Sequence, residues 1–276
     1  MKTEPELNFR TAARVQEFFS TFSSAKNALL LLDYDGTLAP FRVDRFKARP
    51  WAGVRELLSR IQEPGGSSIA TRIVFISGRP AAEIGPLLGL ERPVEVWGLH
   101  GAERLYADGH RELEEPPPAT REKLNELRAQ LRRDSFGGLF EDKPNAVVMH
   151  WRGASGIKAR QIAEKSRAMF KPLSSLQGLQ LLDFESGLEL RSGRDKGGAV
   201  EAILADAAES ALESPVAFLG DDITDEAAFL AVNANRRPHI TALVKRVHRE
   251  TAAAVWLQPP GQLRNFLQQW IAACKR

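Results

Sequence analysis

Two short apolar runs that end in acidic residues constrain this chain of 276 residues more than any other feature. The first run is ALLLLDYD at residues 28–35, and the second is PVAFLGDD at residues 215–222. An uninterrupted apolar run of this length is typical of a strand buried on both faces, as in a parallel sheet covered by helices. The acidic residues therefore mark the points at which two such strands leave the core.

Strand and helix patterns alternate around the first run. Further apolar strand patterns occur at residues 71–78 (TRIVFISG) and 94–101 (VEVWGLHG). Between the first run and residues 71–78, residues 50–63 repeat apolar side chains at helical spacing, and Pro50 is a suitable first residue for that helix. This strand-helix-strand order predicts a parallel sheet wrapped by helices, which is an α/β fold of the Rossmann-like type.

A different pattern fills the middle of the chain. The proline-rich segment EEPPPAT at 114–120 is followed by a charged helical pattern and by shorter, partly polar strand patterns. Such strands are typical of an antiparallel sheet that is covered on one face only. We therefore predict a core formed by residues 1–113 and 188–276, and a smaller inserted α/β domain formed by residues 114–187.

Charge and cysteine content exclude several classes of function. The 38 Lys and Arg residues against 35 Asp and Glu leave a net charge of only +3, and no basic stripe with interleaved aromatic residues indicates nucleic-acid binding. A single cysteine, Cys274, leaves no internal disulfide and no cysteine-based zinc site, so we expect a cytoplasmic protein. The longest apolar run is far shorter than the roughly 20 residues of a membrane span.

The first acidic motif, DYDGT, places two carboxylates at one strand end. Asp33 and Asp35 are two residues apart, so they leave the strand on the same side, at the carboxyl end of the sheet where open α/β folds bind ligands. A turn of the Asp-Gly type would explain Asp35 and Gly36 alone. It would not explain an acidic residue within the strand end, and we therefore interpret both residues as functional.

The second acidic motif is GDDITDE at residues 220–226. Asp221, Asp222 and Asp225 follow another buried strand, where three crowded carboxylates would repel one another. A divalent cation would relieve this repulsion, and carboxylate oxygens suit Mg²⁺. Capping of the following helix by Asp222 or Thr224 would account for one of these residues, but not for all three.

Two single residues could support phosphate chemistry. Ser77 ends a predicted strand within ISGR at 76–79, where its hydroxyl and the adjacent backbone N–H groups could hold a phosphoryl oxygen. Lys196 opens a helical segment, an end at which the helix dipole disfavours a cation. A lysine in that place is often simply solvated, but a nearby carboxylate and phosphate would also explain it.

Taken in order, DYDGT, ISGR, the lysine of RDKGG and GDDITDE resemble the four motifs of the haloacid dehalogenase-like phosphatase superfamily, over nearly the whole chain. Further segments narrow the resemblance to trehalose-6-phosphate phosphatases. These segments are GLHGAE (98–103), EDK (141–143), HWR (150–152) and LELR (188–191).

The resemblance implies an Mg²⁺-dependent phosphatase that hydrolyses trehalose 6-phosphate through an aspartyl phosphate, with the inserted domain acting as a cap over the sugar. Asp33 would be the nucleophile and Asp35 the general acid and base, with Lys196 and Ser77 on the phosphoryl oxygens. The implied metal residues are Asp33, Asp35 (through its backbone carbonyl), Asp221, Asp222 and Asp225. The implied substrate-binding residues are Ser77, Gly78, Arg79, His100, Gly101, Glu141, Lys143, His150 and Glu189.

Alternatives remain open at this point. The substrate could be a related glycosyl phosphate, such as sucrose phosphate, glucosylglycerol phosphate or glucosylglycerate phosphate. A phosphomutase would transfer phosphate without releasing it, and a non-catalytic sugar-phosphate sensor would bind without turnover. We expect a monomer that binds a small sugar phosphate, acts after a trehalose-phosphate synthase, and has neither a nucleic-acid nor a membrane partner.

Overall fold

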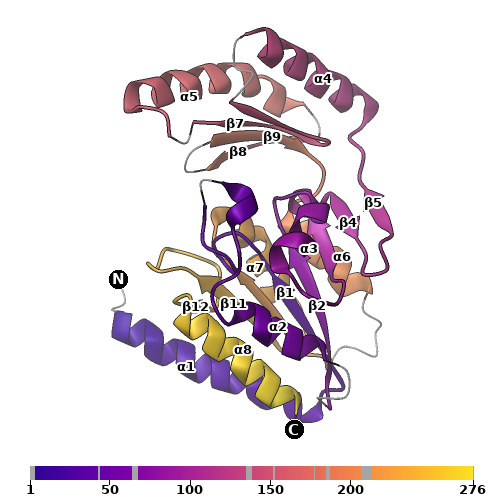
Figure 1. The fold of residues 1–276 in the computed structure, drawn as a ribbon, viewed down its shortest axis with the longest axis vertical. Coiled ribbons are helices and arrows are strands. Elements are labelled where there is room, and N and C mark those ends of the chain that lie inside the picture. The colour runs from indigo at the N-terminus through magenta and orange to yellow at the C-terminus, as the bar shows by residue number, and fades with distance from the viewer. Residues whose placement is uncertain are drawn as a thin grey trace. The chain divides into compact units, whose positions relative to one another are not determined.

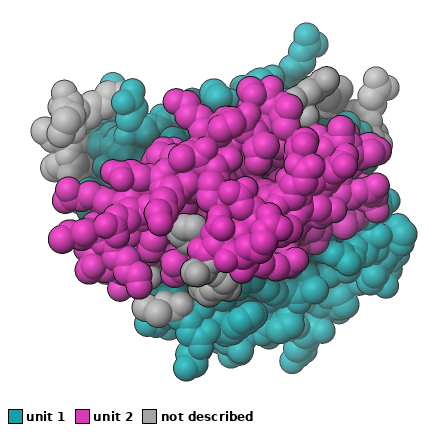
Figure 2. All heavy atoms as spheres, turned by 90° about the horizontal axis from the view of Figure 1, so that it is seen from above, with its two compact units in different colours: residues 1–112, 194–276 teal, residues 113–193 magenta. Residues whose placement is uncertain are grey.

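The computed structural model describes residues 4–42, 44–63, 68–134, 139–151, 153–176, 178–184, 187–206 and 213–275 (Figure 1). The chain forms two compact units, coloured separately in Figure 2. The first unit combines Met1–Glu112 with Arg194–Arg276, and the second is Leu113–Gly193.

A mixed sheet of eight strands organises the first unit, in the order β12-β11-β10-β1-β2-β3-β4-β5. The six strands from β12 to β3 run parallel, and β4 pairs antiparallel with β3. The predicted α/β fold class is therefore confirmed. The strands are β1 (Asn27–Leu32), β2 (Ala70–Ile76), β3 (Glu95–Gly98), β4 (Glu103–Leu105), β5 (Arg111–Leu113), β10 (Val216–Gly220), β11 (His239–Val244) and β12 (Val255–Leu257).

Helices cover both faces of this sheet, which explains why β1 is apolar throughout. Leu30 and Leu32 belong to a core shared with α1, α2, α3 and α8, whereas Leu29 and Leu31 belong to a core shared with α6 and α7. Successive side chains of a strand point to opposite faces, so both sets are buried. The helices are α1 (Glu4–Ser20), α2 (Val54–Gln62), α3 (Ala81–Leu88), α6 (Lys196–Asp206), α7 (Glu226–Asn233) and α8 (Gly261–Cys274).

Two helices differ from the sequence interpretation. Helix α2 begins at Val54 instead of Pro50, because Gly53 takes a left-handed φ of +84° and the Trp51 N–H donates to the carbonyl of Leu38. Helix α1 was not predicted. It packs against the core through Val15, Phe18 and Phe19, whose spacing is that of a helical face.

The second unit is an antiparallel sheet covered on one face. Its strand order is β6-β7-β9-β8, and α4 and α5 pack on the face that carries Val147, Met149 and Leu190. Figure 1 shows both helices beside this sheet. The elements are α4 (Pro118–Arg133), β6 (Phe140–Lys143), β7 (Ala146–His150), α5 (Gly156–Phe170), β8 (Leu179–Phe184) and β9 (Gly187–Ser192).

Strand β9 decides where the second unit ends. It pairs with both β7 and β8, so it is a central strand of the small sheet. The second unit consequently extends to Gly193, beyond the boundary expected at residue 187. The sequence predicted a strand at 188–191, but the strand pattern alone does not specify which sheet the strand joins.

Candidate active site

Asp33 lies at the carboxyl end of β1, between the ends of β2 and β10. Its backbone N–H donates to the carbonyl of Leu219 at 2.9 Å, which continues the parallel pairing by one residue. Its carboxylate is buried and accepts two hydrogen bonds, from Lys196 Nζ to Oδ1 at 2.6 Å and from Thr37 Oγ1 to Oδ2 at 2.9 Å. A carboxylate oxygen can accept more than one hydrogen bond, so both oxygens keep capacity for a further contact.

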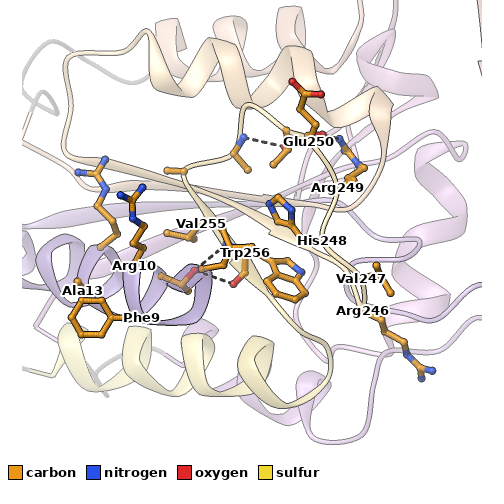
Figure 3. Close-up of a pocket in the computed structure, with 16 residues that line it drawn as sticks. Phe9, Arg10, Ala13, Arg246, Val247, His248, Arg249, Glu250, Val255 and Trp256 are labelled. Atoms are coloured by element: carbon orange, nitrogen blue, oxygen red, sulfur yellow. Dashed lines mark hydrogen bonds between the residues drawn. The ribbon is translucent and has the colours of Figure 1, made fainter. Parts of the chain in front are cut away.

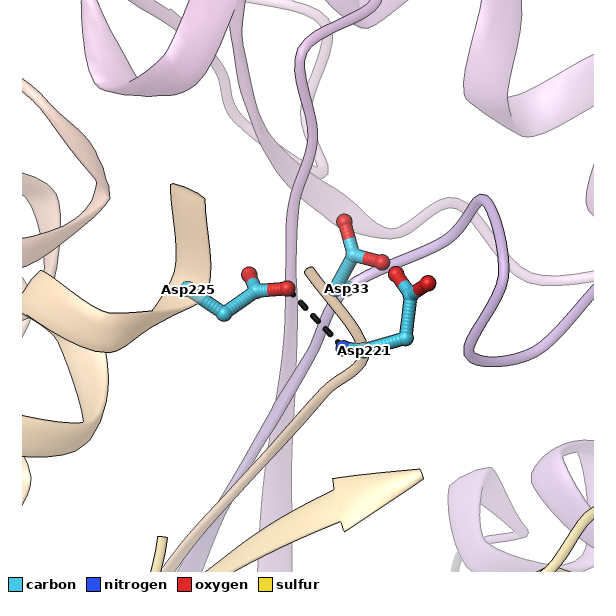
Figure 4. Close-up of side chains that lie close together, drawn as sticks. All are labelled: Asp33, Asp221 and Asp225. Atoms are coloured by element: carbon cyan, nitrogen blue, oxygen red, sulfur yellow. Dashed lines mark hydrogen bonds between the residues drawn. The ribbon is translucent and has the colours of Figure 1, made fainter. Parts of the chain in front are cut away.

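Three carboxylates gather around this strand end (Figure 4). Asp33, Asp221 and Asp225 are all buried, and each offers an oxygen within 4.8 Å of those of the other two. Asp221 directly follows β10, the parallel neighbour of β1, and Asp225 comes from the short 3₁₀ helix η6 (Ile223–Asp225). Two segments almost 190 residues apart in the chain therefore meet, as the order of the acidic motifs predicts.

Lys196 holds two of these carboxylates together. It is the first residue of α6, its side chain is buried, and Nζ donates to Asp33 Oδ1 and to Asp225 Oδ1 at 2.7 Å. Burial by itself lowers the pKa of Lys196, but the Asp225 and Asp33 carboxylates outweigh it and raise that pKa. The ammonium is therefore permanently charged, which explains a cation at the start of a helix.

The other motif aspartates have structural partners. Asp225 Oδ2 accepts from the backbone N–H groups of Asp221 and Asp222, at 2.9 and 3.0 Å. Asp222 caps η6 by accepting from the N–H of Ile223 at 2.7 Å, and its carboxylate is not part of the cluster of three. Asp225 thus orders the loop that presents Asp221. Asp222 caps the short helix η6, whereas the α-helix that follows it, α7 (Glu226–Asn233), has no side-chain cap.

The charge of the cluster is not balanced by the protein alone. Burial raises the pKa of Asp33 to about 7, with Lys196 opposing the shift and Asp225 adding to it. Burial also raises the pKa of Asp221 well above its usual range, and Asp33 and Asp225 increase that shift. The buried ammonium of Lys196 donates to Asp33 and Asp225 but not to Asp221, so a divalent cation would stabilise the ionised forms of these carboxylates.

The donor set fits such a cation. Asp33 and Asp221 offer hard carboxylate oxygens, the ligands that Mg²⁺ prefers. Gly36 makes room for the Asp221 carboxylate, because a Cβ at residue 36 would lie 2.2 Å from Asp221 Oδ2. The backbone φ of +84° at Gly36 also favours glycine. Asp225 is less open to a metal ion, since its oxygens already accept from Lys196 and two backbone N–H groups.

Asp35 is held by an arginine that the sequence assigned to the substrate. Arg79 donates from Nε to Asp35 Oδ2 at 2.6 Å and from a terminal nitrogen to Oδ1 at 2.7 Å, a bidentate pair. The Arg79 side chain is only 8% exposed, and it also lies 3.5 Å from Glu83 and over the ring of Tyr34. Arg79 therefore fixes the orientation of the Asp35 carboxylate.

The predicted phosphate loop is tied to the loop after β3. The Ser77 hydroxyl accepts from the N–H of Arg79 at 3.2 Å, and the Ser77 carbonyl accepts from the N–H of His100 at 2.9 Å. The His100 ring lies against Gly78, where an added Cβ would be 2.6 Å from Nε2. Leu99 and His100 have positive φ, a strained backbone for residues with a Cβ, and such strain is concentrated at functional sites.

Four predicted sugar-binding residues share one face of the small sheet. By strand alternation and register, Glu141, Lys143, His150 and Glu189 lie on the face opposite α4 and α5. Lys143 Nζ donates to Glu189 Oε1 at 3.0 Å, and His150 Nε2 lies 3.1 Å from Glu141 Oε2. This face therefore carries two adjacent polar pairs.

Two residues that contact the acidic cluster were not predicted from the sequence. Thr37 donates from Oγ1 to Asp33 Oδ2, although the sequence patterns assign it no role. Lys245, the residue directly after β11, places Nζ 3.6 Å from Asp221 Oδ2. The rule that identified the aspartates, a polar residue at the end of a buried strand, would also have identified Lys245.

The first unit also has a groove that is separate from these residues (Figure 3). It has a volume of about 1090 Å³ and lies between α1 and the segment 246–256. It is lined by Arg10, Arg14, Arg246 and Arg249 among others, and by none of the predicted site residues.

Comparison with known proteins decides the family. A family model described as trehalose-phosphatase matches residues 31–259, which is more than half of the chain. The chain belongs to the trehalose-phosphatase family. The resemblance inferred from the motifs is thereby confirmed.

Individual relatives of this family agree. A trehalose-phosphate phosphatase of Mycolicibacterium paratuberculosis is 28% identical over 257 residues, which cover 89% of this chain and 62% of that protein. A bifunctional trehalose-6-phosphate synthase/phosphatase of Thermoproteus tenax is 29% identical over 232 residues, which cover 83% of this chain and 30% of that protein. The chain thus spans less than two thirds of the length of these relatives.

Solved structures of similar proteins support the fold. The C-terminal domain of a trehalose-6-phosphate phosphatase from C. albicans has a TM-score of 0.74 at 22% identity, covering 94% of this chain and 96% of that one. A haloacid dehalogenase-like hydrolase from Bacteroides thetaiotaomicron has a TM-score of 0.64 at 18% identity, covering 89% and 100%. Within the described ranges, no helix has the length and apolar character that crossing a membrane requires.

Proposed function

We propose that this chain is a phosphatase that hydrolyses trehalose 6-phosphate to trehalose and inorganic phosphate, with Mg²⁺ as its metal. The observation that carries the proposal is the buried cluster of Asp33, Asp221 and Asp225 around Lys196. Membership of the trehalose-phosphatase family supports the substrate. Relatives named as trehalose-phosphate phosphatases support it as well.

Asp33 is the proposed nucleophile. Its carboxylate oxygen attacks phosphorus, the bond from phosphorus to the sugar oxygen breaks, and an aspartyl phosphate forms on Asp33. Lys196 and Thr37 already donate to this carboxylate, so they fix its orientation before the substrate arrives. Lys196 also supplies positive charge beside the transferred group, which phosphoryl transfer requires.

Asp35 is the proposed general acid and base. It gives a proton to the sugar oxygen as that group leaves, and takes a proton from the water that then attacks the aspartyl phosphate. Free phosphate and the regenerated Asp33 carboxylate result, so the two steps balance. Arg79 holds the ionised Asp35 carboxylate in one orientation, so Asp35 must give up part of this bidentate contact when it carries the proton that it delivers to the sugar oxygen.

Asp33 and Asp221 would hold the metal ion, with Asp225 ordering the loop of Asp221 and Asp222 capping it. When bound, Mg²⁺ supplies charge stabilisation and polarises a phosphoryl oxygen.

Ser77 and the neighbouring N–H groups are proposed to contact the phosphate. We further propose that His100, Glu141, Lys143, His150 and Glu189 contact sugar hydroxyls, because polar pairs of this kind can exchange their mutual bonds for bonds to a polyol.

The test is a substrate panel with a free-phosphate readout. The purified chain, with Mg²⁺, is given trehalose 6-phosphate, sucrose phosphate, glucosylglycerol phosphate and glucosylglycerate phosphate. We expect the highest kcat/KM on trehalose 6-phosphate. A higher value on another member would reassign the substrate, and tight binding without phosphate release would favour a sensor. The sensor is disfavoured here because Asp33, Asp35 and Lys196 are all present.

A further inference from the structure

Lys245 occupies a fixed place beside the acidic cluster. It directly follows β11, which pairs in parallel with β10, so it leaves the sheet at the same end as Asp221. Its backbone is anchored on both sides, because its N–H donates to the carbonyl of Leu257 at 3.1 Å and its carbonyl accepts from Trp256 Nε1 at 2.7 Å. Only the side chain is left to move.

The side chain of Lys245 contacts Asp221 weakly. Nζ lies 3.6 Å from Asp221 Oδ2 and donates to the Asp221 carbonyl oxygen at 3.3 Å. Among the residues that the structure describes, no other basic side chain pairs with the Asp221 carboxylate. Asp221 itself is buried, so this single contact compensates a charge that water reaches poorly.

Lys196 and Lys245 differ in a way that suggests different roles. Lys196 is 3% exposed and donates to two carboxylates at 2.6 and 2.7 Å, so it is a permanent part of the cluster. The Lys245 side chain is 38% exposed and makes one longer ionic contact. A lysine of this kind can turn its ammonium into water at small cost, because exposed ion pairs are weak.

We propose that Lys245 is the exchangeable counter-ion of the cation site. Its ammonium neutralises Asp221 while no divalent cation is bound, and it turns into solvent when a divalent cation occupies Asp33 and Asp221. This inference rests on the proposed function, which assigns a divalent cation to those two carboxylates. Lys245 thus acts through the charge of its ammonium on Asp221, and it lowers the affinity of the site for a divalent cation.

The proposal predicts the direction of a metal-affinity change. In the empty site Lys245 stabilises Asp221, and in the filled site its ammonium repels the bound cation. Both effects weaken metal binding. Removing the charge should therefore tighten binding roughly five- to fiftyfold, the range expected when a partly exposed unit charge lies near a divalent ion at low ionic strength.

Binding of Mn²⁺, followed by electron paramagnetic resonance of the free ion and by competition with Mg²⁺, tests this directly. Lys245→Met keeps the length of the side chain without its charge, and Lys245→Arg keeps the charge. Lys275→Met controls for net charge, because Lys275 follows Cys274 near the start of β2, at the opposite end of the sheet. We expect tighter binding in Lys245→Met alone.

The outcomes separate this inference from the proposed function. If the unaltered chain binds no Mn²⁺, the cation site is wrong and the role of Lys245 falls with it. If the unaltered chain binds Mn²⁺ and Lys245→Met binds it no more tightly, only the counter-ion role is overturned. Unfolding temperatures give a second readout: Lys245→Met should lose stability in chelator and gain more from Mg²⁺ than the unaltered chain, and equal gains would contradict the proposal.

Discussion

At the residue scale, Asp35 provides a direct test of acid-base chemistry. Asp35→Asn keeps the size of the side chain but cannot deliver or accept the proton, so we expect kcat for phosphate release to fall by about 10²–10⁴. Steady-state assays with trehalose 6-phosphate measure this. The unfolding temperature should also fall, because Asn offers only one acceptor oxygen and no charge to the mostly buried Arg79 guanidinium. A rate within a few-fold of the unaltered chain would remove Asp35 from this role.

Single residues also show how far the sequence could predict the site. The motif positions Asp33, Asp221 and Lys196 could be identified because buried strands and a helix start specify where their side chains emerge. The pairing of Asp35 with Arg79 could not, since it depends on where a flexible side chain settles after folding. Nothing in the local sequence distinguishes Arg79 as a partner of an aspartate from Arg79 as a ligand of phosphate.

At the scale of elements, the turn after β1 can be tested with a matched pair of glycines. Gly36 and Gly109 have similar φ values of +84° and +91°, but a Cβ added at Gly36 would lie 2.2 Å from Asp221 Oδ2, whereas a Cβ added at Gly109 would meet nothing within 4 Å. Each change to alanine should cost about 1–2 kcal/mol from the left-handed backbone. Gly36→Ala should also displace Asp221 and abolish activity, whereas Gly109→Ala should leave activity unchanged.

Urea unfolding and phosphate-release assays on both variants measure the two effects. An active Gly36→Ala variant would mean that the close approach of this turn to Asp221 is not needed. Equal losses of activity in both variants would mean that backbone strain, and not the displaced carboxylate, is responsible.

The sequence predicted both the position and the sheet of strands that are buried on both faces, but only the position of other strands. The apolar runs of β1, β2 and β10 specify buried parallel strands, and the structure confirms them. Strand β9 alternates between apolar and polar residues, so its sequence predicts a strand without specifying its sheet. Which sheet it joins depends on pairing with β7 and β8 across long stretches of chain.

At the scale of the whole molecule, the buried carboxylates predict an unusual dependence of stability on pH. The pKa of Asp33 rises from 3.8 to about 7 on folding in the absence of metal. The folded state therefore binds more protons than the unfolded state between these values, and its stability should decrease as pH rises from 4 to 7. Asp221 shifts in the same direction.

Thermal unfolding in chelator and in Mg²⁺ checks this prediction. Mg²⁺ should raise the unfolding temperature more at pH 8 than at pH 5, because the raised pKa values of Asp33 and Asp221 make their metal-binding ionised forms scarcer at the lower pH. A gain from Mg²⁺ that is equal at both pH values would contradict the raised pKa. No gain at either pH would argue against a divalent cation in this cluster.

The thiol of Cys274 reports on the integrity of the fold around α8. Burial raises its pKa, although a hydrogen bond from Thr71 partly opposes the shift, so little thiolate exists at pH 8. We expect iodoacetamide to label the native chain far more slowly than the chain in urea. Mass spectrometry of the alkylated protein over time measures both rates, and comparable rates would mean that α8 does not stay packed on the sheet.

The central claim, that Asp33 carries the phosphoryl group, is tested most directly by trapping the intermediate. The chain is mixed with trehalose 6-phosphate and Mg²⁺, quenched rapidly in acid, digested, and examined by peptide mass spectrometry. The claim predicts one added phosphoryl group on the peptide containing Asp33, and none in the Asp33→Asn variant, which should release no phosphate. Phosphate release at an undiminished rate by Asp33→Asn, or a phosphoryl group on a different residue, would contradict it.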